Sequence, residues 1–285
     1  MSLCEQRAAK VIAMHDMCSY GRSSLTVVEP VLSVLGCQVC PLPTALLSAH
    51  FGFPGPTVLN LGDELKKILQ HWKTLNLHFE CFYSGYLAGP EQVDIAKDYI
   101  KEFSPQFIFV DPVLGDSGQY YPGFDKNQGD AMRRLFSLAH MASPNVTEAC
   151  LLLEEHPRVF IDATTAKDFL ARLSTMGPAK LCITGVPSPD GQTITSYGYD
   201  AQGGHCYKVT SSSVPLNLHG TGDSFASVLV GLTLKGISFD HAMIRAASYL
   251  NKAAQLAYER KEELCIEEAF SSLITGTESA ILEVI

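Results

Sequence analysis

The chain has 285 residues, of which 46% are hydrophobic and 18% charged, a composition that excludes a disordered or collagen-like protein. A chain of this length buries about three quarters of its unfolded surface, so it needs no disulfide framework to form a core. It carries 21 basic and 30 acidic side chains, a net charge of −9. Because nucleic acids and anionic membranes select basic surfaces, we expect neither as a partner.

Cysteine usage and the chain start point to a cytoplasmic protein. No apolar run reaches the roughly 18 residues that span a bilayer, and residues 1–7 lack the order of a secretion signal. Nine cysteines, from Cys4 to Cys265, are an odd number typical of reduced thiols. Cys37 and Cys40 form a CxxC in a strand-like run, where residues three apart point to opposite faces. We therefore predict structural thiols and no metal or disulfide at this pair.

Strand-like and helix-like segments alternate along the chain. Buried strands are predicted from short apolar runs at 10–14, 38–42, 80–83, 107–110 and 181–184. Helices are predicted from Ser23 and Ser24 to Gly36, and at 63–72, 90–103, 130–140, 145–153, 162–176, 222–234 and most of 239–280.

The remaining segments predict loops and one hairpin. A Pro/Gly-rich loop is expected at 43–56, and a mobile loop rich in Gly, Tyr and Asp at 115–129. Two alternating segments, 193–199 and 205–210, surround a turn and predict a β-hairpin. No repeat or linker divides the sequence, so residues 1–285 are predicted to form a single α/β domain.

Polar residues follow most of the predicted strands. In open α/β sheets, ligands bind beyond the carboxyl ends of the strands. The polar groups at those ends are His15-Asp16, Thr44, Ser84-Gly85-Tyr86, Asp111, Asn145 and Thr184. If the strands are parallel, these residues meet at one edge of the sheet, where we expect the chemistry.

The sharpest motif is Gly220-Thr221-Gly222-Asp223, which runs directly into an apolar helix. Glycines before a helix N-terminus let backbone N–H groups approach an anion, which the helix dipole also favours. Asp223 would repel a bound phosphate, so it fits better as a base that takes a proton from an attacking hydroxyl. The alternative is a glycine turn in which Asp223 only stabilises the helix start.

Other common site motifs are missing. Gly231 and Gly236 have the glycine spacing of a Walker loop, but Ile237 stands where that loop requires lysine. A dinucleotide fingerprint fails because Phe225 replaces its third glycine. The histidines show no HExxH pairing, which argues against a catalytic zinc.

Two further constellations allow both a structural and a functional interpretation. Asn145 and Glu148 have the spacing of a helix capping box, and they could also hold Mg²⁺, partly through water. Asp111, directly after a predicted strand, could position a metal or phosphate, or could merely belong to an Asp-Pro turn.

In this order, the motifs resemble the ribokinase-like superfamily and, within it, the pyridoxal/pyridoxamine (vitamin B6) kinases. The resemblance covers about residues 10–260. It rests on residues 15–21, Pro43 to Ser48, Ser84-Gly85-Tyr86, Asp111 to Asp116, Pro144 to Glu148, Ile183-Thr184-Gly185 and Gly220 to Asp223.

The resemblance implies a three-layer α/β/α fold with a mostly parallel sheet, and ATP-dependent phosphorylation of the 5′-hydroxymethyl group of a B6 vitamer. It further implies Mg²⁺, often a monovalent cation such as K⁺, and a homodimer. Asp223 would be the base and the backbone of Gly220 to Gly222 the anion hole. Asp16, Thr44 and Tyr86 would contact the substrate. Mg-ATP would lie among Asp111, Asp116, Ser143, Asn145, Glu148, Thr184 and Thr221, with Asp111, Asn145 and Glu148 serving the metal. Asp116 and Tyr121 would also belong to a loop that closes over the substrate.

One position departs from the family pattern. Known pyridoxal kinases carry Gln-Ser-His where this chain has His15-Asp16-Met17, so Asp16 replaces a serine that contacts the ring. An ionised carboxylate only accepts hydrogen bonds, so it favours a protonated ring nitrogen, a phenol or an amine. Hydroxymethylpyrimidine, an aminopyrimidine with a CH₂OH group, is therefore the alternative substrate, and Asp16 could instead cap a turn. A regulator that has lost catalysis on the same fold is the alternative from another class.

Overall fold

The computed structural model describes residues 7–285, so Cys4 and most of the N-terminal stretch considered for a secretion signal lie outside the described part. A ten-stranded sheet forms its centre. The parallel strands of this sheet are β1 (Lys10–Cys18), β2 (Gln38–Leu47), β4 (Cys81–Ser84), β5 (Phe107–Val110), β8 (Met141–Ala142) and β9 (Lys180–Pro187). Antiparallel strands complete both edges: β3 (Val58–Asn60), β10 (Thr193–Asp200), β11 (His205–Ser212) and β12 (Ile281–Val284). The spatial order is β12-β11-β10-β9-β8-β5-β4-β1-β2-β3.

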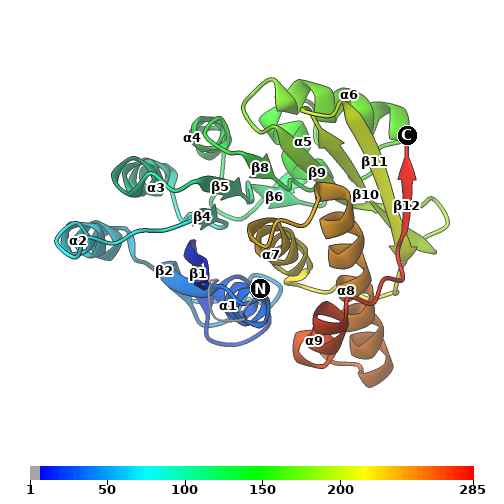
Figure 1. Cartoon of the computed structure of the whole chain (residues 1–285), viewed down its shortest axis with the longest axis horizontal. Helices are drawn as coiled ribbons and strands as arrows, with labels where there is room; N and C mark the ends of the chain where they lie inside the picture. Colours follow the sequence, from blue (N-terminus) through cyan, green and yellow to red (C-terminus); the bar gives the residue numbers. More distant parts are fainter. Residues whose placement is uncertain (1–6) are drawn as a thin grey trace.

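Helices cover both faces of the sheet, which gives the three layers visible in Figure 1. One face is covered by α2 (Gly62–Trp72), α3 (Pro90–Phe103), α4 (Lys126–Phe136), α5 (Val146–Leu152) and α6 (Ala163–Ser174). The other face is covered by α1 (Leu25–Val34), α7 (Thr221–Leu234), α8 (Phe239–Arg260) and α9 (Ile266–Thr275). The predicted fold class, a mostly parallel sheet between two helical layers, is confirmed. Among residues 7–285, no helix is both long and apolar enough to cross a membrane.

The loop predicted at 43–56 is wrong in its first part, because β2 continues to Leu47. Proline cannot donate to a strand ladder, and the predicted loop began at Pro43. On β2, however, β3 pairs only with residues 45–47, so Pro41 and Pro43 leave no donor missing on that side. The strand β1 likewise extends four residues beyond the predicted end at Met14.

The loop predicted at 115–129 is also partly regular. It contains a separate two-stranded sheet of β6 (Gly115–Asp116) and β7 (Gln119–Tyr120), and α4 begins within it. Asp125 caps α4 by accepting hydrogen bonds from the N–H groups of Asn127 and Gln128. The helix therefore starts four residues before the predicted position at 130.

The two CxxC cysteines lie on opposite faces of the sheet, as predicted. Cys37 packs in the core beneath α1 and α7, whereas Cys40 packs against the core beneath α2 and α3, on the opposite face of the sheet. Every cysteine of residues 7–285 is a free thiol.

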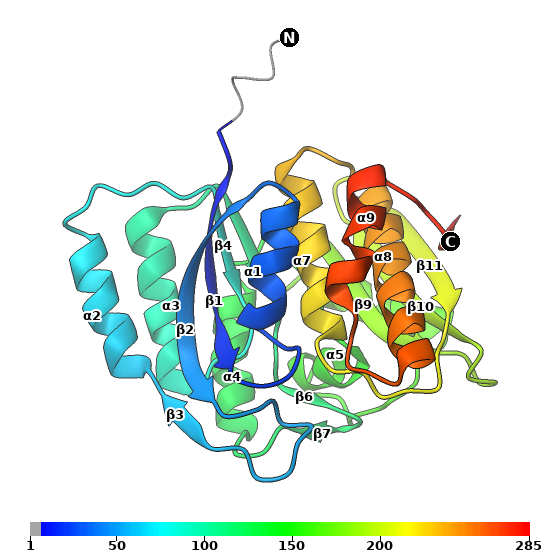
Figure 2. The same ribbon diagram turned by 90° about the horizontal axis from the view of Figure 1, so that it is seen from below.

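The parallel order places the carboxyl ends of the strands along one edge. Figure 2 shows the start of α7 at this edge, beside β6 and β7. A bulge in the pairing of β1 with β2 sets Thr44 and Ala45 of β2 against Asp16 alone, so the extra residue, and the local bend that it causes, belong to β2.

Candidate active site

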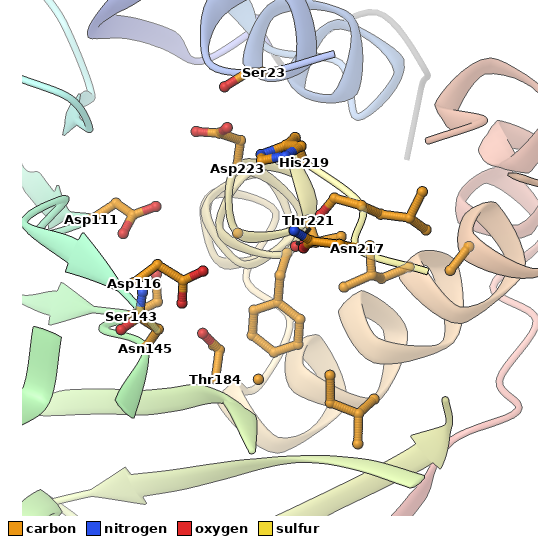
Figure 3. Close-up of a pocket in the computed structure, with 18 of the residues that line it drawn as sticks. Ser23, Asp111, Asp116, Ser143, Asn145, Thr184, Asn217, His219, Thr221 and Asp223 are labelled. Atoms are coloured by element: carbon orange, nitrogen blue, oxygen red, sulfur yellow. Dashed lines mark hydrogen bonds between the residues drawn. The ribbon is translucent and has the colours of Figure 1, made fainter. Parts of the chain in front are cut away.

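A cavity of about 480 Å³ opens at this edge of the sheet, a size typical of small-molecule sites. It brings together nearly all the predicted site residues. Those that line it are Asp16, Tyr86, Asp111, Asp116, Tyr121, Ser143, Asn145, Glu148, Thr184, Gly220, Thr221, Gly222 and Asp223. Figure 3 shows Asp223 and Thr221 at the helix start, across the opening from Asp111, Asp116 and Asn145.

The two glycines of the motif differ in what surrounds them. Gly220 precedes α7 with a φ of 75°, and a Cβ there would lie 2.4 Å from the carbonyl oxygen of Arg22. Only glycine fits this turn, because the backbone conformation and the close approach both exclude a side chain. A Cβ on Gly222 would meet nothing within 4 Å. Gly222 therefore borders open space at the N-terminus of a helix, where an anion is favoured.

Asp223 lies in the first turn of α7, with its side chain 13% exposed. The backbone N–H of Ser24 donates to Oδ2 of Asp223 at 2.8 Å. Burial raises the pKa of the Asp223 carboxyl to about 6. The hydrogen bond from Ser24 opposes this rise, and the nearby Asp16 carboxyl adds to it. A carboxylate with a raised pKa, held at an anion-binding helix start, is suited to accept a proton from a substrate hydroxyl.

Ser24 connects Asp223 to Asp16. The sequence suggested only a helix start here, and Ser24 does occupy the cap position of α1, but its side chain makes no capping bond. Its φ of 53° is unusual outside glycine and costs about 1–3 kcal/mol, a kind of strain that clusters at functional sites. This conformation directs its N–H at Asp223, while its hydroxyl donates to Oδ1 of Asp16.

Asp16 is 3% exposed and faces the cavity. Its second donor is the thiol of Cys18, 3.3 Å from Oδ2. Burial raises the pKa of the Asp16 carboxyl, and the bonds from Ser24 and Cys18 oppose that rise. Both donors are side chains, whereas a turn cap accepts from a backbone N–H group. These two bonds therefore hold the Asp16 carboxyl beside the cavity and are not capping bonds.

Thr44 and Tyr86 have different positions relative to the cavity. Thr44 is fully buried and is not among the lining residues, because its hydroxyl donates to the carbonyl oxygen of Tyr86 at 2.8 Å. Tyr86 lines the cavity near Leu47 and Phe51, and its ring stacks on that of Phe124. Asp16, Leu47, Phe51 and Tyr86 line one part of the cavity, which has aromatic walls and one carboxylate and is called the acceptor arm below.

Asn145 and Glu148 form the predicted capping box at the start of α5. Oε2 of Glu148 accepts from the N–H of Asn145 at 2.8 Å, and Oδ1 of Asn145 accepts from the N–H of Glu148 at 2.9 Å. Oε1 of Glu148 also accepts from the N–H of Leu114, at 3.2 Å. Burial raises the pKa of Glu148 to about 8, although these backbone donors oppose the rise.

The neighbouring carboxyls repel each other. Burial, with Glu148 and Asp223 adding to it, raises the pKa of Asp111 well above its ordinary value. A divalent cation would relieve this repulsion, and oxygen donors suit Mg²⁺. Within residues 7–285, no three acidic, histidine or cysteine side chains gather closely enough to hold an ion. A Mg²⁺ ion at Asp111 and Glu148 would therefore need water or phosphate oxygens to complete its ligands, as this ion prefers.

With this geometry established, comparison with known proteins identifies the family. A model of the phosphomethylpyrimidine kinase family matches residues 68–265. The chain belongs to this family. A crystal structure of a candidate phosphomethylpyrimidine kinase from Bacteroides thetaiotaomicron, in a form with pyridoxal, is 38% identical, covers 98% of this chain and 100% of that chain, and has a TM-score of 0.93. Pyridoxal kinase from Lactobacillus plantarum is 29% identical, over 94% of this chain and 97% of that chain, with a TM-score of 0.86.

A longer relative is an enzyme of thiamine synthesis. The thiamine biosynthetic bifunctional enzyme of Arabidopsis thaliana is 25% identical over 68% of this chain, which corresponds to 35% of that enzyme. The chain thus spans about a third of this relative's length. The predicted membership in a kinase family of the ribokinase-like type is confirmed.

The cavity has a second arm that the sequence did not predict. It runs from Thr184 between the sheet and α8, and apolar side chains dominate its walls. Its members include Ile194, Val209, Phe225, Leu250 and Ala254. These residues look like ordinary core positions of strands and helices, so nothing in their spacing distinguishes them. Ser24 and His219 also line the cavity unpredicted, although His219 directly precedes the glycine motif.

Proposed function

We propose that the protein is an ATP-dependent kinase that phosphorylates the hydroxymethyl group of a vitamin B6 compound: pyridoxal, pyridoxamine or pyridoxine. The observation that carries the proposal is the position of Asp223, between the open helix start at Gly222 and the acceptor arm. The second, apolar arm suits the adenosine of ATP. The acceptor arm offers aromatic faces and a carboxylate to a flat, polar ring.

In this proposal, Asp223 takes the proton of the substrate hydroxyl, whose oxygen attacks the γ-phosphorus while the bond to the β-phosphate oxygen breaks and ADP leaves. The N–H groups at the start of α7 stabilise the phosphoryl oxygens. Mg²⁺ would neutralise phosphate charge. Asp111, Asn145 and Glu148 would hold it, partly through water.

The charge of the cavity favours a neutral acceptor. Among residues 7–285, no lysine or arginine lines the cavity, whereas five carboxyl side chains do: Asp16, Asp111, Asp116, Glu148 and Asp223. A phosphorylated acceptor such as phosphomethylpyrimidine would bring two further negative charges without a cationic side chain to receive them. A neutral alcohol meets no such repulsion.

Hydroxymethylpyrimidine is the second candidate, and Asp16 is the specific observation in its favour. Its amino group can donate to the buried carboxylate, as can a protonated pyridine nitrogen or the phenol of a B6 vitamer. The family model and the Arabidopsis relative support this candidate, whereas the pyridoxal in the Bacteroides structure supports the first. A K⁺ requirement, a homodimer and a cytoplasmic location stay predictions.

The test is a panel of pyridoxal, pyridoxamine, pyridoxine, hydroxymethylpyrimidine and phosphomethylpyrimidine, each with Mg-ATP. ADP release and the mass of the product are measured, with Asp223→Asn as the matched control. We expect a B6 phosphate as the main product, and a kcat about 10²–10⁴ lower in Asp223→Asn, the usual share of acid–base catalysis. Preferred turnover of hydroxymethylpyrimidine would select the second candidate. Ligand binding without any ADP release would indicate a regulator.

A further inference from the structure

The side chain of His15 lies next to that of Asp223, although only its neighbour Asp16 was predicted to contact the substrate. On β1, Val11 and Ala13 face the helical layer of α1 and α7. Side chains alternate along a strand, so His15 belongs to the same face, at its end nearest the cavity. Nδ1 of His15 is 3.9 Å from Oδ1 of Asp223.

The side chain of His15 is enclosed by the protein. The side chain is fully buried, and neither ring nitrogen has a hydrogen-bond partner among residues 7–285. Its ring contacts that of Tyr83 edge-on, with centroids 4.3 Å apart. A Cβ on Gly85 would lie 2.2 Å from Nδ1 of His15, so the glycine of the Ser84-Gly85-Tyr86 motif is what leaves room for this imidazole.

Burial also determines the protonation state of His15. It lowers the pKa of the imidazole to about 3, so the ring is neutral and carries one N–H donor. A polar group buried this completely is normally hydrogen-bonded. An acceptor within reach is the Asp223 carboxylate, whose Oδ1 lies 3.9 Å from Nδ1 and whose Oδ2 already accepts from Ser24.

We propose that His15 is a positioning residue whose Nδ1–H donates to Oδ1 of Asp223 and keeps this carboxylate aimed at the substrate hydroxyl. The inference deepens the proposed function and rests on it. Catalytic hydrogen bonds are often long in free enzymes and shorten in the reactive complex, so the 3.9 Å separation is one that the reactive complex would have to close. Each carboxylate oxygen has two lone pairs, so Oδ1 and Oδ2 can hold these donors and still accept the substrate proton.

Three variants test the proposal by steady-state kinetics. Asparagine places an amide donor near the position of Nδ1, glutamine near that of Nε2, and leucine provides none. We expect His15→Leu to lower kcat about 10- to 100-fold with both KM values within about twofold, because a small misplacement of a reacting group has an effect of this order. His15→Asn should recover most of kcat, and His15→Gln should not. Equal kcat in the Asn and Gln variants, or better rescue by Gln, would overturn the proposal, even if His15→Leu fails to fold.

A measurement without turnover separates this inference from the proposed function. In ¹⁵N NMR of the side chains, His15 should be a neutral imidazole with its proton on Nδ1, and Asp223→Asn should shift that nitrogen signal. If the wild-type protein phosphorylates no member of the panel, the proposed function fails, and the NMR result still decides the contact. A His15 signal unchanged by Asp223→Asn, or a proton on Nε2, would refute the contact itself.

Discussion

The two glycines of the Gly220-Thr221-Gly222 loop provide a matched pair that separates anion binding from turn formation. Gly222→Ala adds a methyl group in open space, and Gly220→Ala adds one against the carbonyl oxygen of Arg22. If the loop only forms a turn, Gly220→Ala should impair the protein and Gly222→Ala should leave both stability and activity unchanged. If phosphate approaches the helix start, Gly222 should matter to catalysis and not to folding.

The expected magnitudes follow from the surroundings of each glycine. Alanine is favoured over glycine in a helix by about 0.5–1 kcal/mol, so Gly222→Ala should unfold at the same or slightly higher temperature. At position 220, a left-handed conformation costs an L-residue about 1–2 kcal/mol, and overpacking adds about 1–3 kcal/mol. Gly220→Ala should therefore lose about 2–5 kcal/mol. Losing one charge-assisted hydrogen bond to phosphate costs about 1.5–3 kcal/mol, which predicts a 10- to 100-fold lower kcat/KM for ATP in Gly222→Ala.

Denaturant unfolding and ATP kinetics on both variants check the prediction. The informative result is a stable Gly222→Ala protein with weak use of ATP. A Gly222→Ala protein with wild-type kcat/KM would refute the assignment of the anion hole. A Gly222→Ala protein that loses several kcal/mol would refute the argument from open space.

Three other predictions concern carboxyl groups. Because the base acts when deprotonated and the pKa of Asp223 is about 6, kcat/KM should fall about tenfold per pH unit below about 6 and level off above it; a flat profile from pH 5 to 8 would contradict this. Glu148→Gln should raise the Mg²⁺ concentration needed for half-maximal activity in addition to costing about 1–3 kcal/mol of stability, because one of its two backbone N–H donors loses its acceptor; a purely capping role predicts the loss of stability with the Mg²⁺ requirement unchanged. Asp16→Ser should change the kcat/KM of one ring relative to the others about tenfold, which equals about 1.4 kcal/mol; ratios within twofold across the panel would show that Asp16 does not read the substrate.

Local signals were sufficient to place many elements of the fold. The helix Pro90–Phe103 agrees to the residue, because proline suits the first turn and the apolar residues repeat with helical period. The strand Phe107–Val110 agrees as well, since a short apolar run between polar segments is typical of a buried parallel strand. The two-residue strand β8 and the short edge strand β3 are too short to show any period. Their pairing depends on neighbouring strands and not on their own sequence.

Some residues of the site could be predicted from local sequence, whereas others depend on contacts between distant parts of the chain. Glycine spacing, the helix entry at Asp223 and the capping box at Asn145 are local features, and the sequence was enough to identify them. The conformation of Ser24 depends on contacts with Asp16 and Asp223, and Asp223 lies 199 residues further along the chain. Thr44 was predicted to contact the substrate, but its hydroxyl donates to the carbonyl oxygen of Tyr86. Only the fold shows that bond, because the two residues are far apart in the sequence.

The electrostatics of the cavity connect these observations to the order of binding. Burial raises the pKa values of Asp111, Glu148 and Asp223, and repulsion from Glu148 and Asp223 adds to the rise at Asp111, so the ligand-free site already disfavours the negative charge of these three carboxyls. ATP alone would add to this charge, since no lysine or arginine of residues 7–285 lines the cavity. The site therefore favours ATP that arrives with its metal ion. Asp111 and Glu148 would hold that ion, whose charge would offset the burial that opposes their ionisation, and Asp223 would be left as the carboxylate that accepts the substrate proton.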